Sequence, residues 1–230
     1  MAKEKFKTYG NVFDEFIKRR LFKLESEGHF ERLEGPVQIG KEANVFSALT
    51  KDGKRIVKIY RLETCDFKRM YDYIKHDSRY IDMRRTRRNI IFSWTQREFR
   101  NLMIARDAGI NVPTPYTFKD NIIVMEYIGK GAPAPQLKDS YPDDPDGFFQ
   151  AVVGFMKKLW KAGLVHADLS QFNILNDSGK PVLIDFSQST TTDSMAAKEY
   201  LERDIRNICN FFKKKGLEKD PSEIQKLVVS

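Results

Sequence analysis

The densest group of side chains that could do chemistry lies between residues 166 and 186. Asp168 and Asn173 stand five positions apart in HADLSQFN (166–173), and Asp185 follows in LIDF (183–186). Phosphoryl transfer needs one carboxylate that orients the attacking hydroxyl, and a side-chain oxygen and a second carboxylate that hold Mg²⁺. Asp168 can fill the first role, and Asn173 and Asp185 the second. Because Asp and Asn are also common turn residues, a purely structural role for the segment stays open.

A strand lysine and a helix glutamate would complete the nucleotide-binding part of this pattern. Lys58 lies among apolar residues in IVKIY (56–60), where a kinase holds the nucleotide phosphates. Alternation does not say which face Lys58 takes, so it could instead extend from a sheet edge into solvent. Glu98 lies on the next expected helix and is the best partner for Lys58, although Glu42 and Glu63 could compete.

A candidate phosphate loop, IGKEANVF (39–46), precedes the lysine strand. It contains a single glycine, Gly40, so it does not match the G-x-G-x-x-G pattern of glycine-rich loops. Composition alone would describe it as an ordinary hairpin.

Two groups of elements must position these residues, and a segment rich in Gly, Pro and Asp (129–147) separates them. In the first group, Phe13, Ile17, Leu21 and Leu24 recur with helical spacing. Antiparallel strands are expected within 37–49 and over 55–60, on both sides of an Asp-Gly turn, and a buried strand over 121–129. Gly35-Pro36 should break the helical pattern before these strands, and Pro113 and Pro115 should mark a turn.

The stretch between the lysine strand and the glutamate helix is polar and strongly basic, and it shows no clean periodicity over 61–94. We therefore expect a long mobile loop there. A helix should follow over 95–109, where Phe99, Leu102 and Met103 have helical spacing and Gly109 is a stop signal.

The second group begins with a strongly amphipathic helix over 149–160. Short strands within 164–169, 172–175 and 181–186 should then carry polar residues into a cleft. Another helix is expected over 201–212, and a last one should begin at Asp220-Pro221.

Composition places the chain among globular proteins. Its 230 residues are 41% hydrophobic and 31% charged, which excludes a disordered tail, a collagen and a disulfide-rich mini-protein. The 40 basic and 32 acidic residues give a formal charge of +8, which favours polyanionic partners but also fits an ordinary basic surface. Cys65 and Cys209 are isolated and fit no metal-ligand spacing, which suggests a reducing cytoplasm. No apolar run approaches the ~20 residues that span a bilayer, so no membrane partner is expected.

Four motifs together resemble the RIO family of atypical serine/threonine protein kinases: GKEANVF, IVKIY, HADLSQFN and LIDFSQS. The resemblance extends over about residues 13–212. The sequence shows no winged-helix domain like that of the second RIO subfamily, so it most resembles the type 1 subfamily.

The resemblance implies an α+β, two-lobed protein-kinase-like fold with an antiparallel sheet lobe and a reduced helical lobe. An N-terminal helix within 1–35 would pack on an N-lobe over 36–129, and a C-lobe over 130–230 would carry the catalytic and metal-binding loops. ATP would bind between the lobes together with Mg²⁺ or Mn²⁺.

The resemblance also assigns site residues by position. Asp168 would be the catalytic base, and Asn173 and Asp185 would be metal ligands. The residues that would bind the nucleotide are Gly40, Lys41, Glu42 and Ala43 at the phosphates, Val45 after them, Lys58 and its partner Glu98, Met125 at the back of the pocket, and Glu126 and Ile128 at the adenine. His166 would buttress the loop, and Asp204 would anchor its backbone from a helix.

The chain departs from ordinary kinases after Asp185. Ser187 stands in place of the glycine of D-F-G, no A-P-E segment follows, and 45 residues are too few for an activation loop and a peptide-docking platform. The family implication is a serine/threonine kinase in which ATP hydrolysis, with transient phosphorylation of Asp185, can matter more than phosphorylation of other proteins. The implied partners are the small ribosomal subunit precursor with its rRNA, and the chain itself by autophosphorylation. The run Arg84–Arg88 is either a solvated loop or a segment that contacts a phosphate backbone.

Two other classes remain open. Small-molecule phosphotransferases and small tRNA-modification kinases carry similar H-G-D-L and I-D-F patterns, but the GKEANV loop and Ala167 argue against both. A non-catalytic RNA- or ribosome-binding module that uses nucleotide as a clamp would fit the charge of +8. It would not need the complete set of Lys58, Asp168, Asn173 and Asp185.

Overall fold

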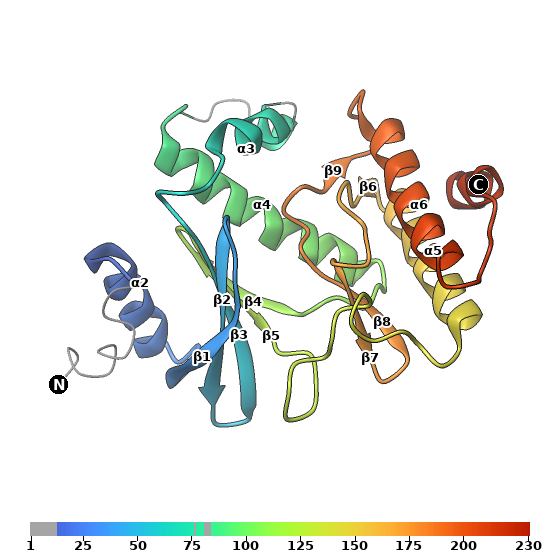
Figure 1. Ribbon diagram of the computed structural model, residues 1–230. Coiled ribbons are helices and arrows are strands. Elements are labelled where there is room, and N and C mark those ends of the chain that lie inside the picture. The colour runs from blue at the N-terminus through green and yellow to red at the C-terminus, as the bar shows by residue number, and fades with distance from the viewer. Residues whose placement is uncertain (1–12, 76, 81–83) are drawn as a thin grey trace.

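A five-stranded antiparallel sheet forms the N-terminal lobe of the computed structural model, which describes residues 13–75, 77–80 and 84–230 (Figure 1). The strands lie in the order β1-β2-β3-β5-β4. Their bounds are β1 Arg32–Ile39, β2 Ala43–Thr50, β3 Gly53–Tyr60, β4 Pro115–Lys119 and β5 Ile122–Glu126. The antiparallel strands predicted on both sides of the Asp-Gly turn are confirmed, and so is the buried strand β5. Residues 1–12 of the predicted segment 1–35 lie outside the described residues.

Successive residues of β3 point to opposite faces of the sheet, as the pleat requires. Val57 and Ile59 are buried together with the N-terminal helix on one face. Ile56, Lys58 and Tyr60 line a cleft on the other face. Because β3 is the central strand, Lys58 does not extend from a sheet edge but points toward the second lobe.

Helix α2 (Glu15–Ser26) covers the outer face of the sheet and confirms the predicted N-terminal helix (Figure 1). The Asp14 carboxylate caps it by accepting the N–H of Ile17 at 2.7 Å. The buried stripe of Ile17, Leu21 and Leu24 packs with side chains of β2, β3 and β5.

Two prolines, Pro36 and Pro115, lie within edge strands of the sheet. β1 continues through Gly35-Pro36 with a shift of register on each side of Pro36, and β4 begins at Pro115. Proline cannot donate a hydrogen bond to a neighbouring strand, but β1 and β4 each have a neighbour on one side only. The helical pattern ends before Gly35-Pro36, as predicted, although the strand begins ahead of this pair, at Arg32. Pro113 lies outside helix and strand, in agreement with the predicted turn, and Pro115 begins the strand that follows.

The predicted mobile loop over 61–94 is wrong for most of its length. Helix α3 (Phe67–Ile74), the 3-10 turn η2 (Ser78–Tyr80) and the start of helix α4 (Arg87–Asp107) occupy it. Side chains of Asp66 and Thr86 cap the two helices. Residues 76 and 81–83 lie outside the described residues. The apolar residues that hold the segment are spaced irregularly among charged ones, and they form one buried cluster: Cys65, Met70, Ile74, Tyr80, Ile90, Ile91 and Trp94.

A buried ionic network fastens this segment to α4. Asp77 is 1% exposed and Arg97 is 0% exposed, and Arg97 Nε lies 3.2 Å from an Asp77 carboxylate oxygen. Arg79 donates two hydrogen bonds to the same carboxylate, at 2.6 and 2.8 Å. Arg79 also donates to Asn101 Oδ1 at 3.1 Å. Asp77 is thus the carboxylate that balances two guanidinium groups.

We expect Asp77→Ala to lower the free energy of unfolding by about 3–5 kcal/mol, because it leaves the buried Arg97 charge without its partner. Urea unfolding measures this loss. Asp72→Ala is the matched control, since it breaks an exposed pair with Lys75 in the same segment and should change stability by less than about 1 kcal/mol. Equal losses for the two variants would contradict the dependence of Arg97 on Asp77.

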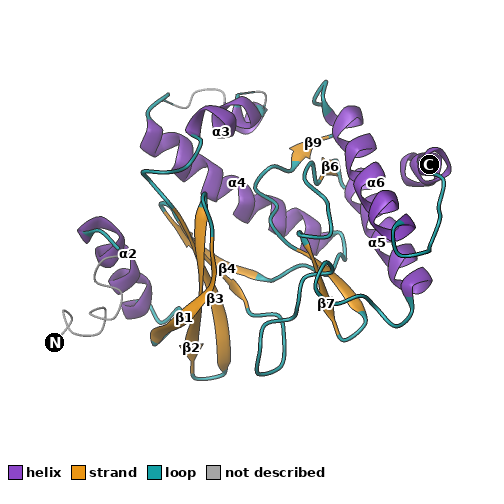
Figure 2. Cartoon of the chain, viewed as in Figure 1, coloured by secondary structure: helices purple, strands orange, loops and turns teal. Residues whose placement is uncertain are grey.

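The C-terminal lobe is mainly helical, with short strands on the side that faces the N-terminal lobe (Figure 2). Its elements are α5 Pro145–Lys161, β6 Leu164–Val165, β7 Ile174–Asp177, β8 Lys180–Leu183, β9 Thr190–Thr191, α6 Ala197–Lys213 and α7 Pro221–Val229. The three helices predicted in this half are confirmed, and so are the short strands. None of the helices in the described residues combines the length and hydrophobicity that a bilayer crossing requires.

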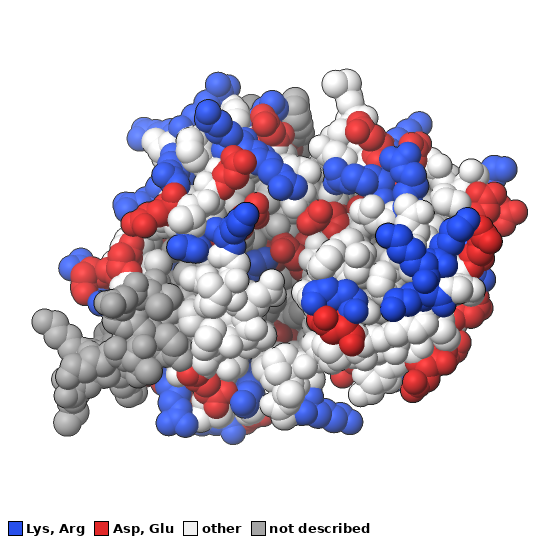
Figure 3. Space-filling view, in the orientation of Figure 1, with Lys and Arg blue, Asp and Glu red and all other residues white. Residues whose placement is uncertain are grey.

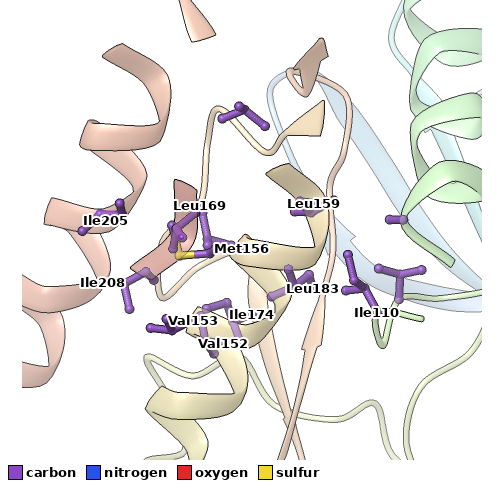
Figure 4. Close-up of a cluster of buried hydrophobic side chains, with 14 of the residues drawn as sticks. Ile110, Val152, Val153, Met156, Leu159, Leu169, Ile174, Leu183, Ile205 and Ile208 are labelled. Atoms are coloured by element: carbon purple, nitrogen blue, oxygen red, sulfur yellow. The ribbon is translucent and has the colours of Figure 1, made fainter. Parts of the chain in front are cut away.

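One apolar core joins the helices of the C-lobe to the sheet. Figure 4 shows Val152 and Met156 of α5 close to Ile174 of β7 and Leu183 of β8, with Ile208 of α6 beside them. The same cluster includes side chains of β5 and the end of α4, so it reaches across to the N-lobe. The predicted two-lobed α+β fold is confirmed, and the shared core fixes where the two lobes face each other.

Candidate active site

A cleft of about 780 Å³ lies between the lobes. Figure 3 shows Asp and Glu side chains gathered in the hollow between the two halves of the molecule. Of the predicted site residues, Asp168 does not line the cleft but lies beside it, in contact with Asn173. The others all line it: Gly40, Lys41, Glu42, Ala43, Val45, Lys58, Glu98, Met125, Glu126, Ile128, Asn173 and Asp185.

Lys58 joins the two lobes electrostatically. Its Nζ lies 2.6 Å from Glu98 Oε1 on α4 and 3.1 Å from Asp185 Oδ1 in the C-lobe. Burial by itself would lower the pKa of Lys58, but the charges of Asp185 and Glu98 outweigh burial and raise it. Neither Glu42 nor Glu63 takes the place of Glu98 in this contact. The lysine is therefore held charged and in one position at the floor of the cleft.

Tyr60 fixes the second oxygen of the same glutamate. Its hydroxyl donates to Glu98 Oε2 at 2.6 Å, and its ring lies 5.0 Å from Lys58 Nζ. Burial raises the pKa of Glu98, and the charge of Lys58 opposes that rise. Sequence analysis missed Tyr60, although its position two residues after Lys58 on one strand places both side chains on the same face.

The candidate phosphate loop between β1 and β2 makes a tight turn at Gly40. The Gly40 N–H donates to the Ala43 carbonyl at 3.0 Å, and a Cβ at Gly40 would lie 2.9 Å from that oxygen. Carbonyls of Lys41 and Glu42 accept hydrogen bonds from the segment that follows β3, including one from Thr64 Oγ1 to Lys41 at 2.9 Å. The single glycine thus stands where a side chain would clash, and the chain before α3 braces the loop.

The connection between the lobes offers backbone groups to a planar ligand. Glu126 ends β5, and its carboxylate accepts hydrogen bonds from the backbone and hydroxyl of Thr114. The Ile128 carbonyl accepts the N–H of Ala134 at 2.9 Å. The backbone N–H of Ile128 is therefore the group of this residue that remains for a ligand. Apolar side chains that sequence analysis missed form the walls on both sides: Val37, Ile56, Ala134, Leu175 and Ile184.

Asp168 is held by amide side chains. Asn173 Nδ2 donates to the Asp168 carbonyl at 2.8 Å and to its carboxylate at 3.2 Å, and Gln188 Nε2 donates to the same carboxylate at 3.0 Å. Burial, reinforced by repulsion from Asp185, raises the pKa of Asp168 to about 6. Gln188 was missed because its place three residues after Asp185 carries no catalytic signature.

Two residues of the site have left-handed backbone conformations that side chains disfavour. Ala167 has φ 64° and Asp185 has φ 62°. Asp204 accepts the N–H groups of Ala167 and Leu169 at 2.8 and 2.9 Å, and Arg203 donates to the Ala167 carbonyl. Asp204, on the buried side of helix α6, therefore holds the backbone of the loop, in the anchoring role that was predicted for it.

The oxygen atoms near Asp185 suit a hard divalent cation. Because both hydrogen bonds of the Asn173 amide to Asp168 come from Nδ2, the amide oxygen of Asn173 is directed elsewhere. Asp185 is partly exposed to the cleft, and Lys58 together with a hydrogen bond from Ser187 at 2.7 Å lowers its pKa against the effect of burial. An amide oxygen and an ionised carboxylate are donors that Mg²⁺ prefers.

His166 is buried behind the site and is neutral. One ring nitrogen, Nε2, lies 3.1 Å from the Ile184 carbonyl, so it carries the hydrogen, and Nδ1 is left without a hydrogen-bond partner among the described residues. Burial lowers the pKa of His166 to about 4. The ring packs 4.7 Å from that of Phe186, in the buttressing role that was predicted.

We expect acid to destabilise the protein through His166. Between pH 7 and pH 5 the unfolded chain binds a proton that the folded chain does not, because the ordinary histidine pKa near 6.5 falls to about 4 on folding. Stability from this group is complete above pH 7 and decreases by about 2 kcal/mol by pH 5. Urea unfolding at the two values should show a smaller decrease for His166→Gln. His29→Gln, at a partly exposed histidine, should keep the wild-type decrease, and an unchanged decrease in His166→Gln would contradict the assignment.

The amino-acid sequence of this chain is similar to those of known proteins. A family model described as RIO domain matches residues 44–225. A RIO-type serine/threonine-protein kinase Rio1 from Methanocaldococcus jannaschii is 42% identical over 227 residues, which cover 98% of this chain and 78% of that protein. The Rio1 protein of Haloferax volcanii is 37% identical with the same coverage. The human serine/threonine-protein kinase RIO1 is 34% identical over 212 residues, 89% of this chain and 37% of that longer protein.

Solved structures support the same fold. The Rio2 kinase from Chaetomium thermophilum in an ADP/Mg²⁺-phosphoaspartate complex superimposes with a TM-score of 0.72 at 24% identity. The match covers 93% of this chain and 66% of that one. A second structure of that Rio2 kinase gives a TM-score of 0.70 at 23% identity.

Proposed function

The chain belongs to the RIO domain family of serine/threonine kinases, and from this premise we propose that it is an ATP-dependent kinase and ATPase of the type 1 subfamily that acts in maturation of the small ribosomal subunit. The observation that carries most weight is the contact of Lys58 with Glu98 and Asp185 across the cleft. An active kinase needs the lysine-glutamate pair and the metal-binding aspartate in place together.

We propose that ATP lies in the cleft with its adenine at the connection between the lobes. The Glu126 carbonyl and the Ile128 N–H would meet the base, with Val45 and Met125 as apolar walls. The loop of Gly40, Lys41, Glu42 and Ala43 would cover the phosphates, and Lys58 would hold them. Asn173 and Asp185 would hold Mg²⁺ or Mn²⁺, which supplies neutralisation of phosphate charge when bound.

Asp168 is the proposed base. It would accept the proton of an attacking hydroxyl or water, and its hydrogen bonds from Asn173 and Gln188 orient the carboxylate for that task. We propose two acceptors of the phosphate: a hydroxyl group, or the carboxylate of Asp185. The second is proposed because the Rio2 kinase of similar fold was solved as a phosphoaspartate complex. In that route the bond from the γ-phosphorus to ADP breaks as a carboxylate oxygen of Asp185 bonds to phosphorus. Water then releases phosphate and gives its proton to Asp168.

Exposed arginines support the proposed partner, a small-subunit precursor with its rRNA. Arg84, Arg85, Arg87 and Arg88 are all exposed. Figure 3 shows basic side chains spread over the face formed by α3 and the start of α4. Cations in such a run gain affinity for a phosphate backbone by releasing its counterions. Three of them also lie over aromatic rings: Arg85 over Tyr71, Arg87 over Phe67 and Arg88 over Phe16.

We also propose a division of the chain and a location in the cell. The chain would divide into an N-terminal helical segment 1–35, an N-lobe 36–129 and a C-lobe 130–230. A cytoplasmic location would agree with Cys65 and Cys209, which are both free thiols.

Steady-state release of phosphate from Mg-ATP tests this function, with and without small-subunit precursor particles at several salt concentrations. We expect slow turnover that the particles change, and particle binding that weakens steeply with salt. Transfer to an aminoglycoside or a choline-like compound without any effect of particles would favour a small-molecule phosphotransferase. ATP binding without turnover would favour a nucleotide-clamped RNA-binding module.

A further inference from the structure

Helix α3 lies between two parts of the proposed site: the phosphate loop, and the C-lobe segment in which Gln188 holds Asp168. The chain before it is tied to the phosphate loop, because Cys65 Sγ lies 3.0 Å from the Glu42 carbonyl and the Arg61 N–H donates to the same oxygen at 2.9 Å. Asp66 caps the first turn of α3 and accepts the N–H of Arg69 at 3.1 Å. The position of Arg69 is thus set by the loop on one side and by the helix cap on the other.

The Arg69 side chain reaches the catalytic side of the cleft. Its guanidinium lies 3.5 Å from Gln188 Oε1, and Gln188 Nε2 donates to the Asp168 carboxylate at 3.0 Å. Its charge also opposes the rise in pKa of both Glu42, in the phosphate loop, and Asp168, in the opposite lobe. Arg69 therefore lies between the proposed phosphate-binding loop and the proposed base.

Arg69 would add a positive charge beyond those of the lysines that line the cleft. Among the described residues that line it, the cations are Lys41, Lys58 and Lys138. Two carboxylates already pair with Lys58, and Lys138 pairs with Asp139 at 2.6 Å. A phosphoryl group in transfer spreads negative charge over three oxygens, and it would pass between the carboxylates of Asp168 and Asp185. In the proposed site, Mg²⁺, Lys41 and Lys58 would neutralise charge of the bound phosphates, and Arg203, whose charge also acts on Asp168, already donates to the Ala167 carbonyl. Arg69 is a further cation on the side of Asp168, reached through Gln188.

We propose that Arg69 is the residue that contacts the phosphoryl group during its transfer, as a cation supplied by α3 from outside the kinase motifs. The inference rests on the proposed phosphoryl-transfer function. Since Arg69 is exposed and its contact with the buried Gln188 is long, the guanidinium can leave Gln188 and bind phosphate oxygens.

Single-turnover transfer from γ-labelled Mg-ATP, with enzyme in excess, tests the proposal. We measure labelled protein plus released phosphate for wild type, Arg69→Ala, Arg69→Gln and Arg69→Lys, and the Kd of a fluorescent ATP analogue for each. Arg69→Ala and Arg69→Gln should lower the rate about 10- to 100-fold, less than a buried donor would, with a change of Kd below about threefold. Arg69→Lys should retain more of the rate. Lys68→Ala removes an exposed charge from the next position of α3 and should leave the rate unchanged.

Three results would overturn the proposal. A wild-type rate in Arg69→Ala would show that no such contact forms. A wild-type rate in Arg69→Gln would show that hydrogen bonding to Gln188 suffices. A Kd that weakens in proportion to the rate would place Arg69 in ground-state nucleotide binding. Absence of transfer by the wild-type enzyme would instead refute the proposed function, and the role of Arg69 with it.

Discussion

Asp185→Asn should reduce the transfer of phosphate from γ-labelled ATP by about 10³-fold or more. The substitution keeps the size of the side chain but removes the charge that faces Lys58 Nζ at 3.1 Å and accepts the Ser187 hydroxyl at 2.7 Å. It also removes the ionised oxygen donor for Mg²⁺ and the proposed acceptor oxygen. Single-turnover labelling with Mg-ATP measures the effect.

The chemistry of the label separates the two roles of Asp185. An acyl phosphate on Asp185 should be cleaved by hydroxylamine, whereas a phosphate ester on serine or threonine should resist it. We expect a hydroxylamine-labile label in wild type that Asp185→Asn loses. Asp143→Asn makes the same chemical change on an exposed loop residue and should keep the label. A stable label that persists in Asp185→Asn would contradict the acceptor role.

The catalytic motifs could be located from sequence because their spacing is set by local geometry. Asp168 and Asn173 belong to one tight loop, and the amide of Asn173 reaches back to the Asp168 carboxylate within it. Lys58 could be located in a strand but not oriented. The face of the sheet from which Lys58 projects follows from the position of β3 between β2 and β5. The alternation of residues within a five-residue strand holds no information about that position.

The segment between Lys58 and Glu98 could not be predicted because its stability comes from tertiary contacts. Asp77 lies between charged and polar neighbours and would be read as exposed from sequence, yet it is buried against Arg97. The apolar residues of α3 number too few for a visible stripe, and they are buried only because α4 lies beside them. Arg69 and Gln188 come from segments 119 residues apart, so their proximity has no local signal.

The left-handed residues show how the site depends on the C-lobe. Ala167 and Asp185 would relax to ordinary backbone conformations if nothing held them. The Asp204 carboxylate, buried on α6, holds the first through two backbone N–H groups, and Asn101 of α4 donates to the carbonyls of Phe186 and Ser189 next to the second. The same helix α4 carries Glu98, so one element sets both the lysine pair and the backbone around Asp185.

Asp168→Asn should lower steady-state release of phosphate by about 10²- to 10⁴-fold, because the amide cannot accept a proton from the attacking group. Nucleotide affinity should change little, since Asp168 does not line the cleft in which ATP is proposed to bind. Release of labelled phosphate and the Kd of a fluorescent ATP analogue measure the two quantities. A variant that releases phosphate at the wild-type rate would remove Asp168 from the mechanism.

The label in the same variant shows which acceptor is used. A carboxylate has no proton to lose, so transfer to Asp185 should still occur in Asp168→Asn, while attack of water on the acyl phosphate becomes slow. Labelled protein should then accumulate above the wild-type level and remain labile to hydroxylamine. Transfer to a hydroxyl needs the base in the first step, so Asp168→Asn would instead lose label, with a rate of labelling at least about 10²-fold below that of wild type. Accumulation would therefore indicate an ATPase cycle through Asp185, and loss of label would indicate an ordinary protein kinase.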